Sequence, residues 1–245
     1  MIKDLVKRTP IIRNLAREAM KVLAHRRQKD FASGDYWEER YKRGGNSGAG
    51  SYSRLAQYKA EVLNKFVADN HVASVIEFGS GDGAQLKLAA YPSYIGVDVS
   101  QTALDATRKA FAGDPTKRFI HPDDLGSEDS ADLSLSLDVV YHLVEDNVFE
   151  RYMAQLFDAS RRFVIVYSSN TDRKSDAVHV KHRKFTDWVE RQRPDFVLTK
   201  ELKNPYPEQI DDLDNTSFAD FYFFEREARR LDLADYFPPT RMNVG

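Results

Sequence analysis

Short apolar runs alternate with longer amphipathic segments along most of the chain. The runs of strand length lie at 75–78, 94–97, 118–121, 131–137, 162–167, 196–199 and 218–224. Apolar residues recur at helical spacing at about 53–67, 100–111, 146–157 and 186–193. Short runs that alternate with helices are typical of strands in a largely parallel sheet. The pattern therefore predicts an α/β fold with seven strands, the last two at the C-terminal end.

Polar residues mark the starts of several predicted helices. Ser53, Asp146 and Thr186 each stand where a side-chain oxygen can accept a bond from a free backbone N–H, so we expect each to cap its helix. A short helix is also expected after Gly83, and it should end before Tyr91-Pro92.

The run at 75–78 passes directly into alternating glycines. Val75-Ile76-Glu77-Phe78 is followed by Gly79, Gly81 and Gly83, which predicts a buried strand ending in a tight loop over a helix N-terminus. Glycine tolerates positive φ and lets a ligand lie against bare main chain. The next apolar run ends in Asp98, where a carboxylate is expected to hold ribose hydroxyls.

The glycine spacing differs from the dinucleotide fingerprint Gly-x-Gly-x-x-Gly, whose third glycine lies inside the helix. Here the spacing is Gly79-x-Gly81-x-Gly83, and Glu77 stands at the end of the strand. A carboxylate at that place would repel a pyrophosphate and would suit a ligand that carries a cationic amino group.

With these residues the chain resembles the class I S-adenosylmethionine (SAM)-dependent methyltransferases, whose first motif is (E/D)-x-G-x-G-x-G. The matching residues are Glu77, Gly79, Gly81, Gly83 and then Asp98. The resemblance implies a Rossmann-like, mostly parallel sheet of seven strands with an antiparallel last strand and helices on both faces. It also implies SAM as cofactor and S-adenosylhomocysteine (SAH) as product.

The resemblance implies a role for each matching position. The glycine loop lies against the methionine and ribose parts of SAM, Glu77 helps to hold the amino-acid end, and Asp98 takes the ribose diol. Asp123 or Asp124, after the third strand, accepts the adenine amine, and the sequence does not choose between them; a solvated acidic turn is the alternative. The other positions expected at the cofactor are Tyr41, Val99 and Asp138.

Four segments are expected along the chain: a helical extension (1–34), a lid (35–53), the methyltransferase domain (54–226) and a tail (227–245). Residues 1–30 are basic and amphipathic, which predicts a helix packed on its own domain or on a second subunit, or else docked on a membrane surface. Residues 35–53 join an aromatic helical turn to a glycine- and serine-rich loop. The resemblance makes this segment a lid over SAM; a plain connector is the alternative.

The end of the fourth strand carries the candidate chemistry of the acceptor. Asp138, Tyr141 and His142 lie at the carboxyl end of a strand, where open α/β sheets bind ligands. His142 is the candidate general base for a hydroxyl acceptor, and a structural histidine is the alternative. His179 and His182 are further candidates that would share one face of a helix.

The basic segment 173–184 suggests an acidic or polyhydroxyl acceptor, with a solvated loop as the alternative. Arg183 and the candidates Tyr141, His179 and His182 are therefore assigned to the acceptor. A metal site built from His142, Asp138 and His179 or His182 has no ligand cluster of recognisable type, so no metal is expected.

Composition and charge argue against several kinds of partner and site. The chain has 245 residues, a net charge of −2 and no cysteine, so nothing suggests a nucleic-acid partner, a disulfide framework or a thiolate metal site. No apolar run approaches the roughly 20 residues of a membrane span. We expect a cytoplasmic protein, with residues 1–30 as a possible contact to the inner face of the membrane, and either a monomer or a homodimer.

The sequence therefore predicts a methyltransferase for a small-molecule, sugar or glycan acceptor, with O-methylation favoured. It is similar in layout to bacterial methyltransferases of surface-polysaccharide and glycolipid pathways. Two other functions stay open: an NAD-linked oxidoreductase on a Rossmann sheet, and a SAM-binding scaffold or sensor without catalysis.

Overall fold

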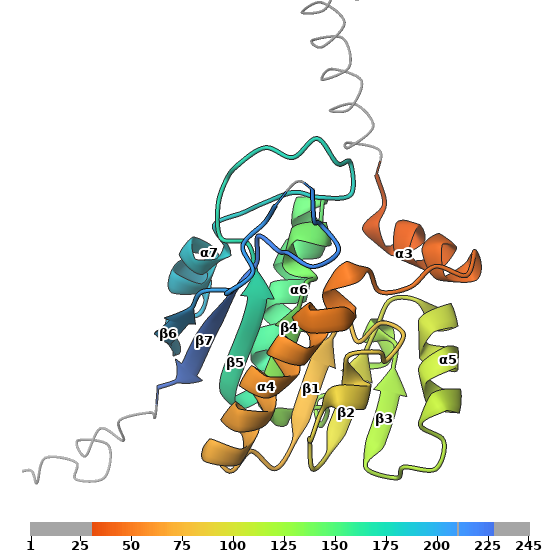
Figure 1. Cartoon of the computed structure of the whole chain (residues 1–245). Helices are drawn as coiled ribbons and strands as arrows, with labels where there is room; N and C mark the ends of the chain where they lie inside the picture. The colour runs from red at the N-terminus through yellow and green to blue at the C-terminus, as the bar shows by residue number, and fades with distance from the viewer. Residues whose placement is uncertain (1–30, 210, 228–245) are drawn as a thin grey trace, which may run out of the picture.

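A computed structural model describes residues 31–209 and 211–227 (Figure 1). One seven-stranded sheet runs through the molecule in the order β3-β2-β1-β4-β5-β7-β6. The strands are β1 (Val75–Phe78), β2 (Tyr94–Val97), β3 (Lys117–Ile120), β4 (Ala131–Leu137), β5 (Ser160–Ser168), β6 (Phe196–Leu202) and β7 (Asp220–Arg226). The predicted α/β class with seven strands is confirmed.

The sheet is parallel from β3 to β5, and β7 runs antiparallel to both of its neighbours. Because β7 lies between β5 and β6, the last strand of the described residues is inserted into the sheet and β6 forms its edge. The expectation of a mostly parallel sheet with an antiparallel last strand is therefore also confirmed.

Helices cover both faces of the sheet because alternate strand residues point to opposite sides. The helices are α3 (Ser33–Lys42), α4 (Ser53–Asp69), α5 (Gln101–Ala110), α6 (Asp146–Asp158) and α7 (Phe185–Gln192). Phe163, Ile165 and Tyr167 of β5 pack with residues of α4 and α5. Val164 and Val166 pack with α6 and α7. Both faces of the sheet are buried, which explains why the run from Phe163 to Tyr167 of β5 is wholly apolar.

The chain after the glycine loop differs from the prediction. Only a 3₁₀ turn, η2 (Leu86–Leu88), stands where a helix was expected, so the loop does not lie over a helix N-terminus. The segment between Gly83 and Tyr94 is too short for a full helix that also returns to the start of β2. Gly83 packs instead on α5, since a Cβ there would meet Thr107 at 2.9 Å.

The three predicted caps are wrong, although the helices exist. Ser53 is the first residue of α4, has a φ of 53°, and makes no capping bond. Asp146 lies inside the first turn of α6, where Lys181 and Arg183 bind its carboxylate. Thr186 lies inside α7, and its N–H donates to the Asn170 side chain at 3.3 Å. For Asp146 and Thr186, a contact with a distant segment replaces the local cap.

The predicted extension (residues 1–30 of 1–34) and the tail (228–245 of 227–245) lie outside the described residues, so they stay predictions. No helix in the described part of the chain is long and apolar enough to cross a membrane. The carboxyl ends of the parallel strands point to the top of Figure 1, where α3 and the loops at 169–184 and 203–219 gather.

Candidate functional site

A cavity opens at the carboxyl ends of β1, β2 and β4. Its empty space is about 930 Å³ when the open solvent at its mouth is included. We call it the inner cavity; α3, the glycine loop, the end of β2, the exit of β4 and α6 supply its walls. The strand β1 lies between β2 and β4, so the cavity sits at the point where the strand order reverses, the usual ligand site of open α/β sheets.

The glycine loop presents bare main chain to this cavity. Gly79, Gly81 and Gly83 have φ values of 80°, 57° and 74°, a region that other residues adopt only at a cost. At Gly81 space is also limiting, because a Cβ would meet the Tyr41 hydroxyl at 2.9 Å. Any larger residue at Gly81 would push away the segment that closes the cavity.

Asp98 joins the glycine loop to the end of β2. Its Oδ2 accepts a hydrogen bond from the Gly81 N–H at 2.8 Å, and its Oδ1 accepts one from the Ser100 N–H at 2.9 Å. A carboxylate offers about four acceptor positions, so Asp98 retains capacity for two further donors. Asp98 and Val99 both line the inner cavity, and burial raises the pKa of Asp98.

Glu77 does not face the inner cavity. Its side chain is buried below the glycine loop and accepts a hydrogen bond from the Tyr94 hydroxyl at 2.7 Å. Burial raises the pKa of Glu77 to about 7. The expectation that Glu77 holds the amino-acid end of a cofactor is therefore not supported, because the alternation of β1 directs this side chain under α4.

Asp123 and Asp124 also lie away from the cavity. Both are exposed in the 3₁₀ turn η3 (Pro122–Asp124), and only Pro122 of this turn contributes to the cavity wall. The predicted choice between two adenine acceptors has no support from their positions.

The lid segment (35–53) is docked on the glycine loop by polar contacts. The Ser47 N–H and the Tyr52 hydroxyl both donate to Asp82, at 3.0 and 2.7 Å. The Tyr41 hydroxyl lies 2.9 Å from Ser47 Oγ. Trp37 and Tyr41 line the inner cavity, so this segment forms one of its walls, and the role of Tyr41 at the cofactor stays a prediction.

A carboxylate in α3 fixes the same segment to α5. Glu38 accepts hydrogen bonds from the hydroxyls of Ser100 (2.6 Å) and Thr102 (2.9 Å). The bond from Ser100 is the main reason that the pKa of Glu38 falls to about 2. Glu38 could not be predicted from the sequence, because nothing local distinguishes it from the neighbouring Glu39.

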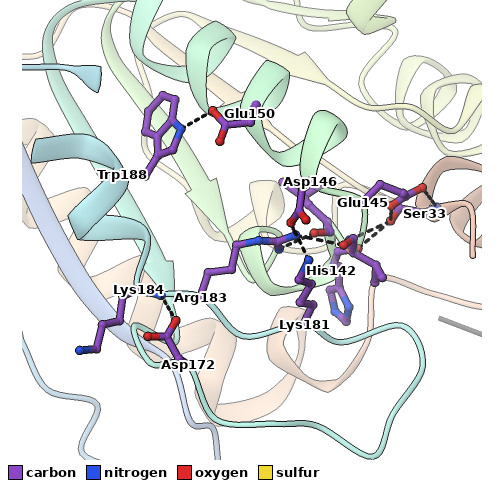
Figure 2. Close-up of polar contacts among 12 residues, drawn as sticks. Ser33, His142, Glu145, Asp146, Glu150, Asp172, Lys181, Arg183, Lys184 and Trp188 are labelled. Carbon is purple, nitrogen blue, oxygen red and sulfur yellow. Dashed lines mark hydrogen bonds and ion pairs between the residues drawn. The ribbon is translucent and has the colours of Figure 1, made fainter. Parts of the chain in front are cut away.

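The start of α3 is bound to the turn that follows β4. The Ser33 N–H donates to Glu145 Oε1 at 2.8 Å, and the Ser33 hydroxyl donates to the His142 carbonyl oxygen at 2.9 Å (Figure 2). The segment that closes the cavity thus also contacts the backbone of the candidate base.

A second, wider cleft adjoins the inner cavity. This outer cleft encloses about 1380 Å³ including open space. Its walls come from α3, the lid loop, the segment 173–182 and the loop 208–218. It shares Trp37, Ser47, Asp138 and His142 with the inner cavity. The two spaces therefore meet at the exit of β4, at the η4 turn (Val140–His142).

His142 lies at this junction in its neutral form. Its Nδ1 is 2.9 Å from the carbonyl oxygen of His179, which identifies Nδ1 as the protonated nitrogen and Nε2 as the acceptor. Burial lowers the pKa of His142 to about 4. Its ring packs edge-on against Trp37 at 4.9 Å and stacks on His179 at 5.4 Å.

His179 and His182 reach the outer cleft by a route other than the predicted helix. The segment 171–184 is irregular, so the two rings do not share a helical face. His179 stacks on Tyr36 at 5.1 Å. His182 is buried, with Nδ1 2.7 Å from Ser169 Oγ and Nε2 accepting from Arg173 at 3.3 Å. Burial lowers the pKa of both histidines.

Arg183 does not line either space. Its guanidinium donates to the Leu143 and Val144 carbonyl oxygens and to Asp146, at 2.5, 3.0 and 2.8 Å. Figure 2 shows Arg183 and Lys181 both directed at Asp146. The expectation that Arg183 binds the acceptor is not supported, because these contacts use its donors to hold the segment 181–184 against the start of α6.

Asp138 lies between the two spaces and has a partner that the sequence analysis missed. Its Oδ2 is 2.6 Å from Lys59 Nζ, and its Oδ1 accepts from the Tyr141 hydroxyl at 2.9 Å. Lys59 is buried in α4. A signal existed, because Leu55, Lys59 and Leu63 follow one another at helical spacing on the apolar face.

Within 31–209 and 211–227, no group of three or more His, Cys, Asp or Glu residues could hold a metal ion.

Comparisons of the whole chain give structural neighbours only. No family model and no curated protein matches the sequence. The methyltransferase domain of a bacterial Hen1 (CtHen1) superposes with a TM-score of 0.55, at 18% identity over 71% of this chain and 100% of that chain.

Two further neighbours have cofactor or product bound. The magnesium protoporphyrin IX methyltransferase of Synechocystis PCC 6803, with bound SAM, superposes with a TM-score of 0.55 at 16% identity, over 80% of this chain and 98% of that chain. The N-methyltransferase NodS of Bradyrhizobium japonicum WM9, in complex with SAH, gives 0.55 at 11% identity, over 71% and 88%. Identities this low establish a shared architecture, and with the strand order and the glycine loop they show that this chain has the class I SAM-dependent methyltransferase fold.

Proposed function

We propose that this protein is a SAM-dependent methyltransferase that methylates a hydroxyl of a small-molecule, sugar or glycan acceptor. One observation carries the proposal: the inner cavity, walled by the glycine loop and Asp98, opens at Asp138 and His142 into a second cleft. A transferase for two substrates needs two such spaces that meet where the group passes. A scaffold or sensor that only binds SAM has no need of the outer cleft.

The residues of the inner cavity fit SAM. Asp98 retains acceptor positions for a ribose diol, and Gly81 leaves main chain exposed where a Cβ does not fit. Val99 and Tyr41 supply apolar and aromatic wall beside them. When bound, SAM supplies an activated methyl group on a sulfonium, so the protein has to orient the acceptor and remove its proton.

The same geometry argues against a dinucleotide. A pyrophosphate is normally held at a helix N-terminus, and the glycine loop here is followed only by the 3₁₀ turn η2. Glu77 does not repel a pyrophosphate in this cavity, because its side chain is bonded to Tyr94 outside it. The missing helix N-terminus is therefore the reason to prefer a ligand without phosphate.

The outer cleft suits a polar acceptor without a large net charge. Three cations and three anions line it: Arg40, Arg173, Lys174, Asp138, Asp176 and Glu208. Arg173 and Glu208 are paired at 2.9 Å, which removes part of the basic character that the sequence suggested. Aromatic rings of Tyr36, Trp37 and Phe218 add flat apolar surface. This balance supports a polyhydroxyl compound, such as a sugar, over a polyanion.

We assign His142 as the base. Its Nε2 carries the free lone pair, and the His179 carbonyl oxygen fixes the ring and the tautomer. The low pKa keeps this nitrogen unprotonated at neutral pH, although it also makes the imidazole a weaker base than usual.

Binding and transfer can be tested separately. Calorimetric titration with SAM, SAH and NAD should show binding of the first two alone. Incubation with methyl-labelled SAM and a panel of sugars, glycolipids and small hydroxyl compounds should then label one acceptor class. Binding of NAD in place of SAM would refute the proposal at its first step, and labelling of amines alone would refute O-methylation.

A further inference from the structure

Lys59 is a charged residue in the interior of the molecule. Its side chain is 1% exposed, between the sheet and α4, with Leu55 and Leu63 one turn to either side. Taking an ammonium group out of water costs several kcal/mol unless it is paired. Its Nζ lies 2.6 Å from the Asp138 carboxylate and 5.4 Å from the centre of the Tyr167 ring. A methionine of similar length would avoid this cost, so the charge calls for an explanation.

Asp138 is held in a strained conformation by this pairing. Its φ is 61°, in the left-handed region. Strain of this kind persists only where the surroundings over-determine it, and it concentrates at binding sites. Here Lys59 holds Oδ2, the Tyr141 hydroxyl holds Oδ1, and the Asp138 N–H donates to the Tyr167 carbonyl oxygen at 2.9 Å.

The fixed carboxylate faces the inner cavity next to the glycine loop. Asp138 and its neighbour Val139 both line the cavity, and the Val139 side chain packs directly on Gly79. Two other acids lie in this region: Asp98, which the proposed function assigns to the ribose diol, and Glu77, which feels the charge of Lys59 but is sealed from the cavity and bonded to Tyr94. His142, which also feels the charge of Asp138, is neutral. Asp138, next in the chain to the residue that packs on Gly79, is therefore the carboxylate left for a cationic group of the cofactor.

We propose that the Asp138 carboxylate receives the ammonium group at the amino-acid end of the cofactor, and that Lys59 is the positioning residue that holds this carboxylate. The inference rests on the proposed function, because it assigns one end of the SAM site. Two of the roughly four acceptor positions of the carboxylate are used by Lys59 and Tyr141, so two remain for the ligand. Asp138, directly after the neighbouring strand β4, thus takes the role that the motif suggests for Glu77.

Two ligands that differ only in the amino-acid end separate this role from a structural one. SAH carries that end, whereas 5′-methylthioadenosine has the same adenosine and thioether without it. In Lys59→Met we expect SAH to bind at least about tenfold more weakly. Without Lys59 the Asp138 carboxylate is no longer held, so its charged hydrogen bond to the ammonium group of the ligand is lost or misplaced. The affinity for 5′-methylthioadenosine should stay within about twofold.

Two more variants complete the test. Tyr141→Phe removes the other bond to Asp138 with little change of volume, and it should also weaken SAH selectively, though less. It tests the inference by itself if Lys59→Met does not fold. Glu77→Gln is the matched control: it changes the other acid near Lys59 and should leave the ratio of the two affinities as in the wild type.

Unchanged SAH affinity in folded variants, or an equal loss for both ligands, would overturn the inference while leaving the proposed function intact. A ratio shifted by Glu77→Gln in place of Lys59→Met would return the role to Glu77. A wild-type protein that binds neither ligand would instead refute the proposed function itself.

Discussion

Burial shifts the pKa values of three side chains around the inner cavity. It raises the pKa of Asp98 and brings that of Glu77 to about 7, whereas it lowers that of His142 to about 4. Each shift disfavours the charged form, as expected where water is excluded. The residues with the clearest predicted chemistry are thus also those whose acidity depends most on tertiary packing.

Replacing Asp98 should remove most of the affinity for SAM. A carboxylate that binds a diol makes charged hydrogen bonds worth about 1.5–3 kcal/mol each, so Asp98→Ala should weaken SAM at least about tenfold. Calorimetry on the folded variant measures this. Because Asp98 also accepts from Gly81 and Ser100, Asp98→Asn is the control that keeps part of those backbone contacts. SAM binding of wild-type strength in Asp98→Ala would contradict the assignment of the cavity.

Replacing His142 should lower turnover by roughly 10²–10⁴, the usual contribution of a positioned base. SAM affinity should change little, because the free Nε2 serves the acceptor. The sequence alone places the rising limb of the pH–rate profile near the ordinary histidine value. With the lowered pKa, the limb should lie near pH 4, and the rate should be flat from about pH 6 to 8.

The exposed His71 offers a control for this variant. It has a positive φ, which asparagine tolerates, so His71→Asn should keep full turnover. Near-wild-type turnover in His142→Ala would move the search for a base to His179 or His182. Loss of activity with a chelator, restored by a divalent cation, would instead favour the metal alternative.

Glu77 should make stability depend on pH. Its folded pKa of about 7 lies above the ordinary 4.5, so the folded state holds a proton that the unfolded state releases. The stabilisation is full below about pH 4.5 and is lost as the pH rises through 7. Glu77→Gln keeps an acceptor for Tyr94 and removes the titration. Its free energy of unfolding relative to the wild type should therefore rise by up to about 3 kcal/mol between pH 4.5 and 8.

Urea unfolding at several pH values measures this difference. The exposed Glu61 supplies the control Glu61→Gln, for which the difference should stay near zero. A flat difference for Glu77→Gln would mean that the buried carboxyl is not protonated at neutral pH.

At the scale of elements, α3 and the lid loop form one wall of the inner cavity, and we predict that this wall moves. Glu38 holds α3 to the first turn of α5, while Ser47 and Tyr52 hold the loop to Asp82. These contacts are polar and partly exposed, so the segment should open at a low free energy compared with the sheet. Binding of SAH should slow hydrogen exchange across 36–53.

Glu38→Gln should accelerate that exchange in the free protein, because a neutral amide is a weaker acceptor for Ser100 and Thr102. Glu39→Gln is the matched control, since Glu39 contacts only the exposed Arg43 among the polar contacts described. The fluorescence of Trp37 should change when SAH is added, and Trp188→Phe removes the signal of the other tryptophan. Exchange that is indifferent to both ligand and Glu38 would show a fixed connector in place of a lid.

At the scale of the whole molecule, the sheet, its two apolar layers and both cavities come from the described residues. A chain of residues 31–227 should therefore fold cooperatively and bind SAH with the affinity of the full chain. Thermal unfolding and calorimetry on the two proteins test this. A broad, uncooperative transition of the shorter chain would show that residues 1–30 or 228–245 belong to the core or to an obligate interface.

The sequence by itself determined the α/β class, the strands, the glycine loop and the position of Asp98. These features depend on neighbouring residues: the periodicity of apolar side chains, and glycines where the chain must turn. The resemblance to class I methyltransferases depends on the same short stretches, which explains why the fold it implied is the fold observed.

Tertiary structure alone decided which polar groups meet. Lys59 reaches Asp138 across 79 residues and Glu38 reaches Ser100 across 62, whereas the expected helix that would pair His179 with His182 does not form. Arg183 is of a residue type that often binds ligands, yet its N–H groups donate to the Leu143 and Val144 backbone carbonyl oxygens. Which side chain faces the cavity depends on strand direction and on contacts between distant segments. Neither can be predicted from the pattern of neighbouring residues in the sequence.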